Sequence, residues 1–324
     1  MANNYAKSRL VGSVVSMPTF TNPDYSVNLD KHRHHVRWLL KQGYEEGNCV
    51  LLIAGGAGET YMLEESEFKA LAELLIQETQ GAAPTMVMVA ELSARAASRK
   101  CQIAAEAGID FVLLSPPHYV TPTEEDIYLH HKYVNDRVEI GIMTYNSFWV
   151  MPSGYSYSRA LFERLATLEN VVGVKWTGAT TEDYLGFQQM FGDRFAMSEN
   201  RQFFSMGARF GMKSRIDVIG NVAPRLSLLQ TQLMKDGAYD QIEELYKKFN
   251  FDHIYNRSGP PRPGASMVAD GPHARMLLRH LGMETGPAFP GQADPPSDYV
   301  NWWRDSINDG GLLEWVDWDD SEFQ

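Results

Sequence analysis

The chain has 324 residues, of which 44% are hydrophobic and 22% are charged, and its formal net charge is -12. This composition is typical of a folded protein with a sizeable core, and the length allows one large domain or two ordinary ones. The acidic balance argues against sequence-independent binding of nucleic acid or of anionic membranes, because both need basic patches. It leaves anionic small molecules open as ligands, because a site can be locally positive in an acidic protein.

Cysteine usage and the termini suggest the compartment. Cys49 and Cys101 are the two cysteines, and no Cys-x-x-Cys pair is present, so we expect free thiols in a reducing environment. The N-terminal segment lacks the apolar stretch of a secretory signal, and no window reaches 18 apolar residues. We therefore expect a cytoplasmic protein without a membrane span.

Short apolar, β-branched runs recur along the first two thirds of the chain. In chain order they cover residues 10–20, 49–56, 85–92, 110–117, 140–146, 171–178, 194–200 and 216–221. Most are nearly continuous rather than alternating, which is typical of parallel strands that are covered on both faces.

Helix-like segments lie between these runs. The clearest cover residues 30–43, 64–81, 93–108 and 158–169, where apolar residues recur at spacings of three and four. The strand–helix unit repeats eight times, which predicts a (β/α)8 barrel, a TIM barrel, over residues 1–225. Strand counting alone leaves an open, doubly wound sheet as the alternative.

The chain from residue 226 to residue 324 has a different pattern. It predicts two helices, a loop rich in proline and glycine, and a further helix over residues 271–283. An acidic tail rich in tryptophan follows. We interpret this part as a C-terminal helical region, and we expect its tryptophans to pack on this subunit or on a neighbouring one; they are Trp302, Trp303, Trp315 and Trp318.

Lys175 lies in the apolar stretch "NVVGVKWTGA". Alternate side chains on a strand share a face, so the bulky residues Val174 and Trp176 would face the helices and Lys175 would point into the barrel. A desolvated lysine has a lowered pKa and a larger share of neutral amine, which can attack a carbonyl to form a Schiff base. A lysine paired with an inward carboxylate such as Asp217 is the open alternative.

Small residues follow the second predicted strand in "GGAGET". They let backbone N–H groups approach an anion, so this loop is a candidate carboxylate site; its residues are Gly55, Gly56, Ala57, Gly58 and Glu59. A tight strand–helix turn that merely needs glycine explains the same pattern. The dinucleotide fingerprint is not met, because Tyr61 occupies the third glycine position.

Further polar residues are expected at the carboxyl ends of barrel strands, where sites of this fold lie. Tyr145 and Tyr119 could pass protons, and the alternative for each is a packed aromatic with a satisfied hydroxyl. The remaining candidates for substrate binding at strand ends are Asn146, Thr177, Arg201, Asp217 and Gly220.

Two histidine clusters, at residues 32–35 and 130–131, lie in helix-like segments. No carboxylate or cysteine pattern completes a metal-ligand set, so we expect no metal and interpret these histidines as parts of solvated helix faces.

Taken together, these motifs resemble the lysine Schiff-base lyases of the dihydrodipicolinate synthase and N-acetylneuraminate lyase superfamily. The resemblance rests on "GGAGE", "TYN" and "GVKWTG" in that order, and it covers about residues 10–290. It implies a barrel with C-terminal helices, a homotetramer or homodimer, and no cofactor. It also implies that Lys175 forms an imine with a 2-oxo acid, that Tyr145 moves protons, and that Tyr119 reaches the site of a neighbouring subunit.

Within that superfamily the sequence looks most like the 5-dehydro-4-deoxyglucarate dehydratase branch. It departs from the family pattern in three places. Many relatives have a loop threonine where this chain has Gly56 and Ala57, and the residue after "YN" is Ser147 rather than the basic one of the dehydratase branch. The synthases carry an arginine a few residues after the tyrosine, and "NSFWVMPSG" has none, which argues against a dihydrodipicolinate synthase. Phe148 and Trp149 suggest an apolar pocket wall, and a substrate with an apolar distal group.

The leading hypothesis is therefore a class I aldolase or dehydratase acting on a 2-oxo acid. Two alternatives remain open from the sequence. The chain could be a non-catalytic barrel that binds 2-oxo acids, or an enzyme in which the carboxylates Asp217 and Glu199 act as acid and base while Lys175 is only a counter-ion.

Overall fold

The computed structural model describes residues 2–119, 121–147, 154–200, 203–248 and 270–323. Its centre is a closed barrel of parallel strands in the order β1 to β8, which confirms the (β/α)8 barrel and excludes the open sheet. The strands are β1 (Gly12–Ser16), β2 (Cys49–Ile53), β3 (Thr85–Val89), β4 (Phe111–Leu114), β5 (Gly141–Tyr145), β6 (Val171–Trp176), β7 (Ala196–Glu199) and β8 (Ser214–Asp217).

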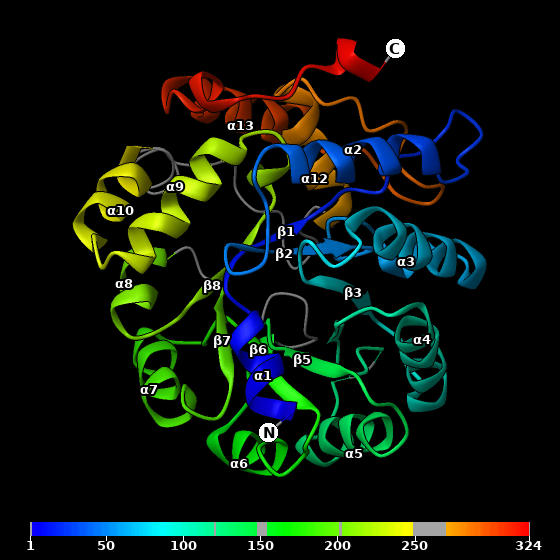
Figure 1. Cartoon of the computed structure of the whole chain (residues 1–324), viewed down its shortest axis with the longest axis vertical. Helices are drawn as coiled ribbons and strands as arrows, with labels where there is room; N and C mark the ends of the chain where they lie inside the picture. The colour runs from blue at the N-terminus through cyan, green and yellow to red at the C-terminus, as the bar shows by residue number, and fades with distance from the viewer. Residues whose placement is uncertain (1, 120, 148–153, 201–202, 249–269, 324) are drawn as a thin grey trace.

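Helices surround this barrel (Figure 1). Those that follow the strands are α2 (Leu29–Lys41), α3 (Glu65–Thr79), α4 (Ala94–Ala107), α5 (Glu124–Asn135), α6 (Arg159–Leu165), α7 (Thr181–Phe191), α8 (Phe204–Arg209) and α9 (Pro224–Lys235). The remaining helices are α1 (Ala2–Arg9), α10 (Tyr239–Tyr246), α12 (Asp270–His280) and α13 (Ser297–Asp309). The expected boundary near residue 225 thus falls at the start of α9.

Local sequence signals set where the helices begin and end. The Thr123 side chain accepts a hydrogen bond from the backbone of Asp126, whose carboxylate accepts one from the backbone of Thr123, so α5 starts with a capping box. A glycine ends α4: Gly108, at the C-cap, has φ 94, a left-handed conformation that glycine adopts without strain.

β8 begins ahead of the apolar run that predicted it. Its first residues, Ser214 and Arg215, are polar, so they did not count toward that run. Arg215 donates a hydrogen bond to Asp217 at 2.7 Å, which compensates for its partial burial.

The barrel interior has its own core. Side chains that point inward from the strands form a cluster that includes Val14, Leu52, Met86, Leu113 and Met143. Outward-facing side chains instead join the larger core between the strands and the helices.

The N-terminal helix α1 closes one end of the barrel, which the sequence pattern did not predict. Arg9 forms ion pairs with Glu46 and Asp110, which precede β2 and β4, so α1 lies at the amino ends of the strands. Leu10 is fully buried beneath it, and a Cβ added to Gly173 would lie 2.8 Å from Leu10 Cδ1. The opposite, carboxyl ends of the strands carry the candidate site.

The histidine clusters are buried, so the prediction of solvated helix faces is wrong for His32, His35, His130 and His131. These residues lie on the faces of α2 and α5 that pack on the rest of the protein, and neighbouring polar groups bind several of the rings. His32 accepts a hydrogen bond from the Phe20 backbone at 3.1 Å, and His131 lies 2.8 Å from the Thr144 hydroxyl. Of the cluster residues, His34 is the exposed histidine.

The tryptophan-rich tail packs on the same subunit. The ring of Trp318 lies 4.9 Å from that of Trp38 on α2 and 5.2 Å from that of His35. Figure 1 shows α12 and α13 next to α2, with the C-terminus beyond them and the N-terminus on the opposite side of the molecule. Within the described residues, no helix has both the length and the apolar composition that crossing a membrane requires.

Candidate active site

Lys175 points into the barrel, as the strand pattern predicts. It is the strand partner of Tyr145 on β5 and of Ser198 on β7, near the carboxyl ends of these strands. Its side chain is 7% exposed. Because burial disfavours the charged form, the pKa of Lys175 is lowered to about 8, although the negative charge of Asp270 acts in the opposite direction.

Tyr145 lies directly beside this amine. The Lys175 Nζ atom is 4.1 Å from the centre of the Tyr145 ring, a distance at which the ring face stabilises a cation. Burial raises the pKa of Tyr145, and the charge of Asp270 adds to this effect, while the Ser147 hydroxyl opposes it. Tyr145 is therefore a neutral phenol at physiological pH, able both to donate and to accept a proton.

The "GGAGE" loop is packed tightly against the end of β1. A Cβ added to Gly58 would lie 2.8 Å from the Met17 carbonyl oxygen, and the Thr19 hydroxyl donates to the Gly58 carbonyl oxygen at 2.5 Å. A Cβ added to Gly55 would likewise lie 2.9 Å from the Ser16 hydroxyl oxygen. Glycine at these two positions lets the backbone itself form the surface of the loop, next to the end of β1.

Glu59 ends this loop in a left-handed conformation with φ 54. Its carboxylate is fully buried and accepts hydrogen bonds from Arg275 Nε at 2.8 Å and Nη2 at 2.5 Å. Arg275 lies on α12 and also donates to the Thr285 carbonyl oxygen at 2.9 Å. The Glu59 side chain therefore joins the loop to the C-terminal region, whereas the sequence pattern suggested substrate binding for it.

Asp270, the first residue of α12, is a site residue that the sequence analysis missed. A Cβ added to Gly56 would lie 2.8 Å from Asp270 Oδ2, so the carboxylate occupies the space next to the loop. Its charge acts on both Lys175 and Tyr145. No spacing rule connects a helix start near residue 270 with β6, so the sequence carried no signal for this contact.

Asn146 and Thr177 hold the ends of β5 and β6 together. The Thr177 hydroxyl donates to the Asn146 carbonyl oxygen at 2.9 Å, and the Asn146 amide oxygen accepts from the backbone of Tyr157 at 3.0 Å. Both side chains are fully buried. In this structure they position the strand ends beside Lys175.

Asp217 and Gly220 do not join this site. Asp217 is the strand partner of Val15, which belongs to the outer core, and it binds the Ser227 hydroxyl at 2.6 Å and the Gly220 backbone N–H at 2.9 Å. Burial would raise its pKa, but Arg215 and these hydrogen bonds lower it overall.

Glu199 also faces outward, because it is the strand partner of Trp176 rather than of Lys175. Its Oε1 atom accepts a hydrogen bond from the Phe203 backbone at 3.1 Å. The structure therefore does not place the proposed acid–base pair of Asp217 and Glu199 beside Lys175, and Asp217 is not the counter-ion of the lysine.

Tyr119 is 84% exposed in the single chain. It follows β4 and does not contact Lys175 in the same subunit. The expectation that it reaches a neighbouring site stays a prediction. Arg201, Phe148 and Trp149 lie outside the described residues.

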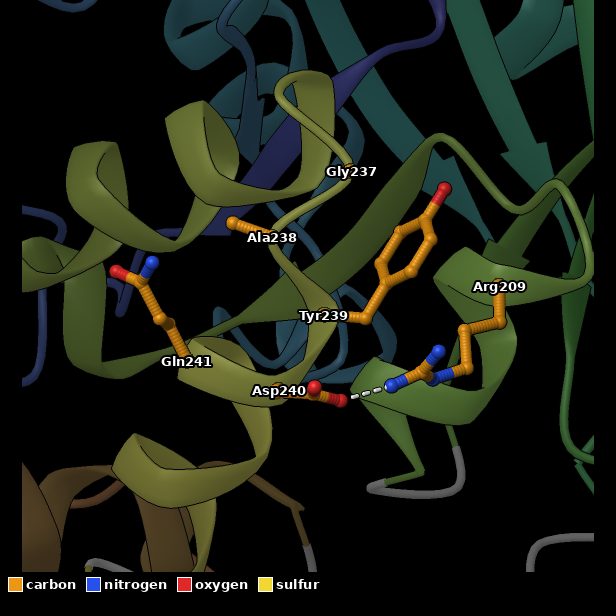
Figure 2. A pocket seen from close by; sticks show the side chains of 6 residues that line it. All are labelled: Arg209, Gly237, Ala238, Tyr239, Asp240 and Gln241. Carbon is orange, nitrogen blue, oxygen red and sulfur yellow. Dashed lines mark hydrogen bonds and ion pairs between the residues drawn. The ribbon is translucent and has the colours of Figure 1, made fainter.

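A shallow hollow lies elsewhere on the surface, between α8 and α10. Figure 2 shows that its lining includes Tyr239, Gln241 and the ion pair between Arg209 and Asp240. It belongs to the outer layer of helices, and Lys175 does not line it. Among the described residues, no group of three or more histidine, cysteine, aspartate or glutamate side chains is arranged to hold a metal ion.

Comparison with known proteins relates the chain to one family. The model of the dihydrodipicolinate synthetase family matches residues 9–256. A 4-hydroxy-tetrahydrodipicolinate synthase from Methylobacterium radiotolerans is 34% identical over 221 residues, which are 68% of this chain and 71% of that protein.

Two solved structures have the same fold. One is dihydrodipicolinate synthase from Acinetobacter baumannii complexed with pyruvate, which superposes with a TM-score of 0.78 at 22% sequence identity. The match covers 94% of this chain and 99% of the Acinetobacter chain. The enzyme from Aquifex aeolicus also has a TM-score of 0.78, at 20% identity, and the match covers 95% and 99% of the two chains. At these identities the structural similarity concerns the fold alone. The family match and the relative from Methylobacterium radiotolerans, by contrast, show that the chain belongs to the dihydrodipicolinate synthetase family and is a lyase.

Proposed function

We propose that the protein is a class I lyase in which Lys175 forms a Schiff base with the keto carbon of pyruvate or of a larger 2-oxo acid. One observation supports this above the others: the amine of Lys175 is buried inside the barrel, beside Tyr145, and has a pKa of about 8. At neutral pH a useful fraction of this amine is uncharged and nucleophilic. The family relative from Acinetobacter baumannii was solved with pyruvate, which is the smallest such acid.

The reaction begins when the neutral amine attacks C2 of the substrate. Water leaves, and the product is a protonated imine, which withdraws electrons from C3. The cation stabilises negative charge at C3, whether that charge arises by loss of a proton or by breaking of the C3–C4 bond. Tyr145 is the proton carrier in this scheme, since its phenol is neutral and lies against the amine.

Imine formation is open to any 2-oxo acid, but we expect the protein to act on a narrower class of substrates. We propose a 2-oxo acid with a hydroxylated chain, such as a deoxy sugar acid of the 5-dehydro-4-deoxyglucarate type, or one with an apolar distal group. The "GGAGE" backbone is the candidate site for the substrate carboxylate. We also propose a homodimer or homotetramer, in which the exposed Tyr119 contributes to a neighbouring site.

Reductive trapping tests the imine. Pyruvate and cyanoborohydride are expected to add one covalent group to the wild-type chain, at Lys175, as measured by mass spectrometry of peptides. Lys175→Arg is expected to abolish the adduct, and Lys175→Ala is expected to lower turnover by several orders of magnitude.

Lys100→Arg is the matched control, because Lys100 is also buried but is paired with Glu91 at 2.5 Å. Equal labelling of the wild type and Lys175→Arg would refute the proposal. Thermal stabilisation by 2-oxo acids without an adduct or turnover would instead identify a binding protein.

A further inference from the structure

Tyr157 lies outside the barrel, behind the end of β5. Its ring belongs to the core between the strands and the helices, whereas the ring of Tyr145 belongs to the core inside the barrel. Tyr157 precedes Ser158, the N-cap of α6, and its ring centre lies 6.2 Å from that of Phe162, the fourth residue of the helix. This is the hydrophobic staple of a helix start, so the ring is held by packing and its polar groups are available for other contacts.

Two polar groups of Tyr157 bind the end of β5. Its hydroxyl donates to the Tyr145 carbonyl oxygen at 3.2 Å and lies 3.2 Å from the Thr144 hydroxyl. Its backbone N–H donates to the Asn146 amide oxygen at 3.0 Å. Three consecutive residues are thus bound from outside the strand, and the middle one is the tyrosine beside the Lys175 amine.

The contact continues to α5 through His131, one of the buried histidines. His131 Nδ1 lies 2.8 Å from the Ile127 carbonyl oxygen, which can only accept, so Nδ1 carries the hydrogen. Burial lowers the pKa of His131 to about 4, so the ring is neutral at pH 7 and Nε2 accepts from the Thr144 hydroxyl at 2.8 Å. The Tyr157 O–H then faces two acceptor oxygens, each at 3.2 Å. Both distances exceed the usual value of about 2.7–2.8 Å, as expected when one hydrogen is shared between two acceptors.

We propose that Tyr157 is a positioning residue for Tyr145: its hydroxyl fixes the peptide group of the proton carrier and so the place of the phenol beside Lys175. The inference rests on the proposed function, because it assumes that Tyr145 moves protons. Tyr157 is 3% exposed, and Thr144 and His131 are fully buried. A buried hydroxyl without an acceptor is costly, so these contacts favour one position of the strand end over others.

Tyr157→Phe in the full-length chain removes the hydroxyl and keeps the ring. Two measurements with pyruvate separate its effects: the fraction of the chain trapped by cyanoborohydride at completion, and the rate at which the C3 hydrogens exchange for deuterium in D2O, followed by NMR. The trapped fraction is expected to match the wild type, because Lys175 is unchanged. Exchange also needs the proton carrier, and we expect it to be about 10–100-fold slower, since a misplacement of about 1 Å can cost about 100-fold in rate.

Tyr145→Phe distinguishes positioning from an independent effect. It is expected to slow exchange at least as much as Tyr157→Phe does, and the double variant is expected to be no slower than Tyr145→Phe alone, because Tyr157 acts through Tyr145. Tyr155→Phe is the matched control, since the Tyr155 hydroxyl donates to Glu124 at 2.6 Å rather than to β5, and it is expected to exchange at the wild-type rate.

Several outcomes would overturn the inference. They are exchange at the wild-type rate in Tyr157→Phe, losses that multiply in the double variant, and a Tyr157→Phe chain that loses trapping together with exchange, which would show that the hydroxyl serves the fold. A wild-type chain that is trapped but does not exchange would reject Tyr145 as the proton carrier, and this inference with it. A wild-type chain that forms no adduct would instead reject the proposed function.

Discussion

Lys175 weakens the fold while it is charged. Burial lowers its pKa from 10.5 to about 8, so at pH 7 both the folded and the unfolded states hold the ammonium, and the folded state holds it at a cost. Between pH 8 and pH 10.5 the unfolded state binds more protons, so the free energy of unfolding rises with pH in this window. Such a cost to stability is common for active-site residues, which agrees with the role proposed for Lys175.

Lys175→Met is accordingly expected to stabilise the protein at pH 7, by up to about 3 kcal/mol, as the pKa difference implies. The gain should shrink as the pH rises from 8 toward 10.5, because the folded wild-type chain then holds the neutral amine, which burial does not penalise. Urea unfolding of the variant and the wild type at pH 7 and at pH 10 measures the difference. Lys100→Met should instead lose stability, because Glu91 would lose its partner, and a loss of stability in Lys175→Met at pH 7 would contradict this account.

Among the helices, α12 has a special position, because it joins the C-terminal region to the "GGAGE" loop that follows β2. Its ion pair between Arg275 and Glu59 is almost fully excluded from solvent, at 2% and 0% side-chain exposure. Burial raises the pKa of Glu59, and Arg275 opposes this effect. Such pairs cost much to break, because the remaining charge has no solvent.

Arg275→Met is therefore expected to lower the free energy of unfolding by about 3–5 kcal/mol. It should also slow pyruvate trapping, because Arg275 would no longer fix Glu59 and the "GGAGE" loop, the candidate site for the substrate carboxylate. Chemical unfolding and trapping on the same preparation measure both effects. Arg304→Met removes an exposed partner of Asp305 and serves as the control, with an expected change of about 0–1 kcal/mol.

The sequence predicted the positions of the helices and strands better than it predicted the tertiary contacts between them. Continuous apolar runs mark β2 to β6, because both faces of those strands are buried, and the same logic pointed Lys175 inward. It missed the start of β8, whose first residues are polar, and it missed α1, which has no apolar stripe. The contact of Asp270 with the loop could not be predicted, since it depends on how α12 docks on the barrel.

Histidine exposure was the other failure, and its reason is chemical. Histidine is polar enough to lie in water, yet its neutral ring packs well, so a helix pattern cannot decide between the two. His35, for example, packs among Phe20, Trp38 and Trp318 while its Nε2 atom lies 3.2 Å from the Asn221 carbonyl oxygen. Tertiary contacts from three distant segments determined its burial.

The whole molecule is consequently sensitive to acid. Burial lowers the pKa of His32, His35 and His130 from 6.5 to about 3 and that of His131 to about 4. Between pH 6.5 and about pH 3–4 these histidines are protonated in the unfolded chain but neutral in the folded chain. The free energy of unfolding therefore falls as the pH falls through this window. Each such histidine contributes up to about 1.4 kcal/mol per pH unit in this window.

We expect the free energy of unfolding to decrease steeply from pH 6.5 to pH 4, as followed by urea unfolding at several pH values. His130→Leu should reduce the slope by about one fifth of the histidine contribution, because it removes one of five such rings; the fifth is His273, whose pKa burial lowers to about 4. His34→Gln, at an exposed position of α2, is the comparison variant. A slope that is identical in His130→Leu and the wild type would show that His130 does not contribute.

The ion pair between Arg275 and Glu59 joins segments that are far apart along the chain, α12 and the loop after β2. A ribosome releases all eight strands well before it releases α12. The Glu59 carboxylate therefore has no arginine partner until the last part of translation, and until then it must stay in water or take up a proton. A truncated chain that ends before α12 would keep the strands of the barrel but would lack the ion pair that fixes this loop.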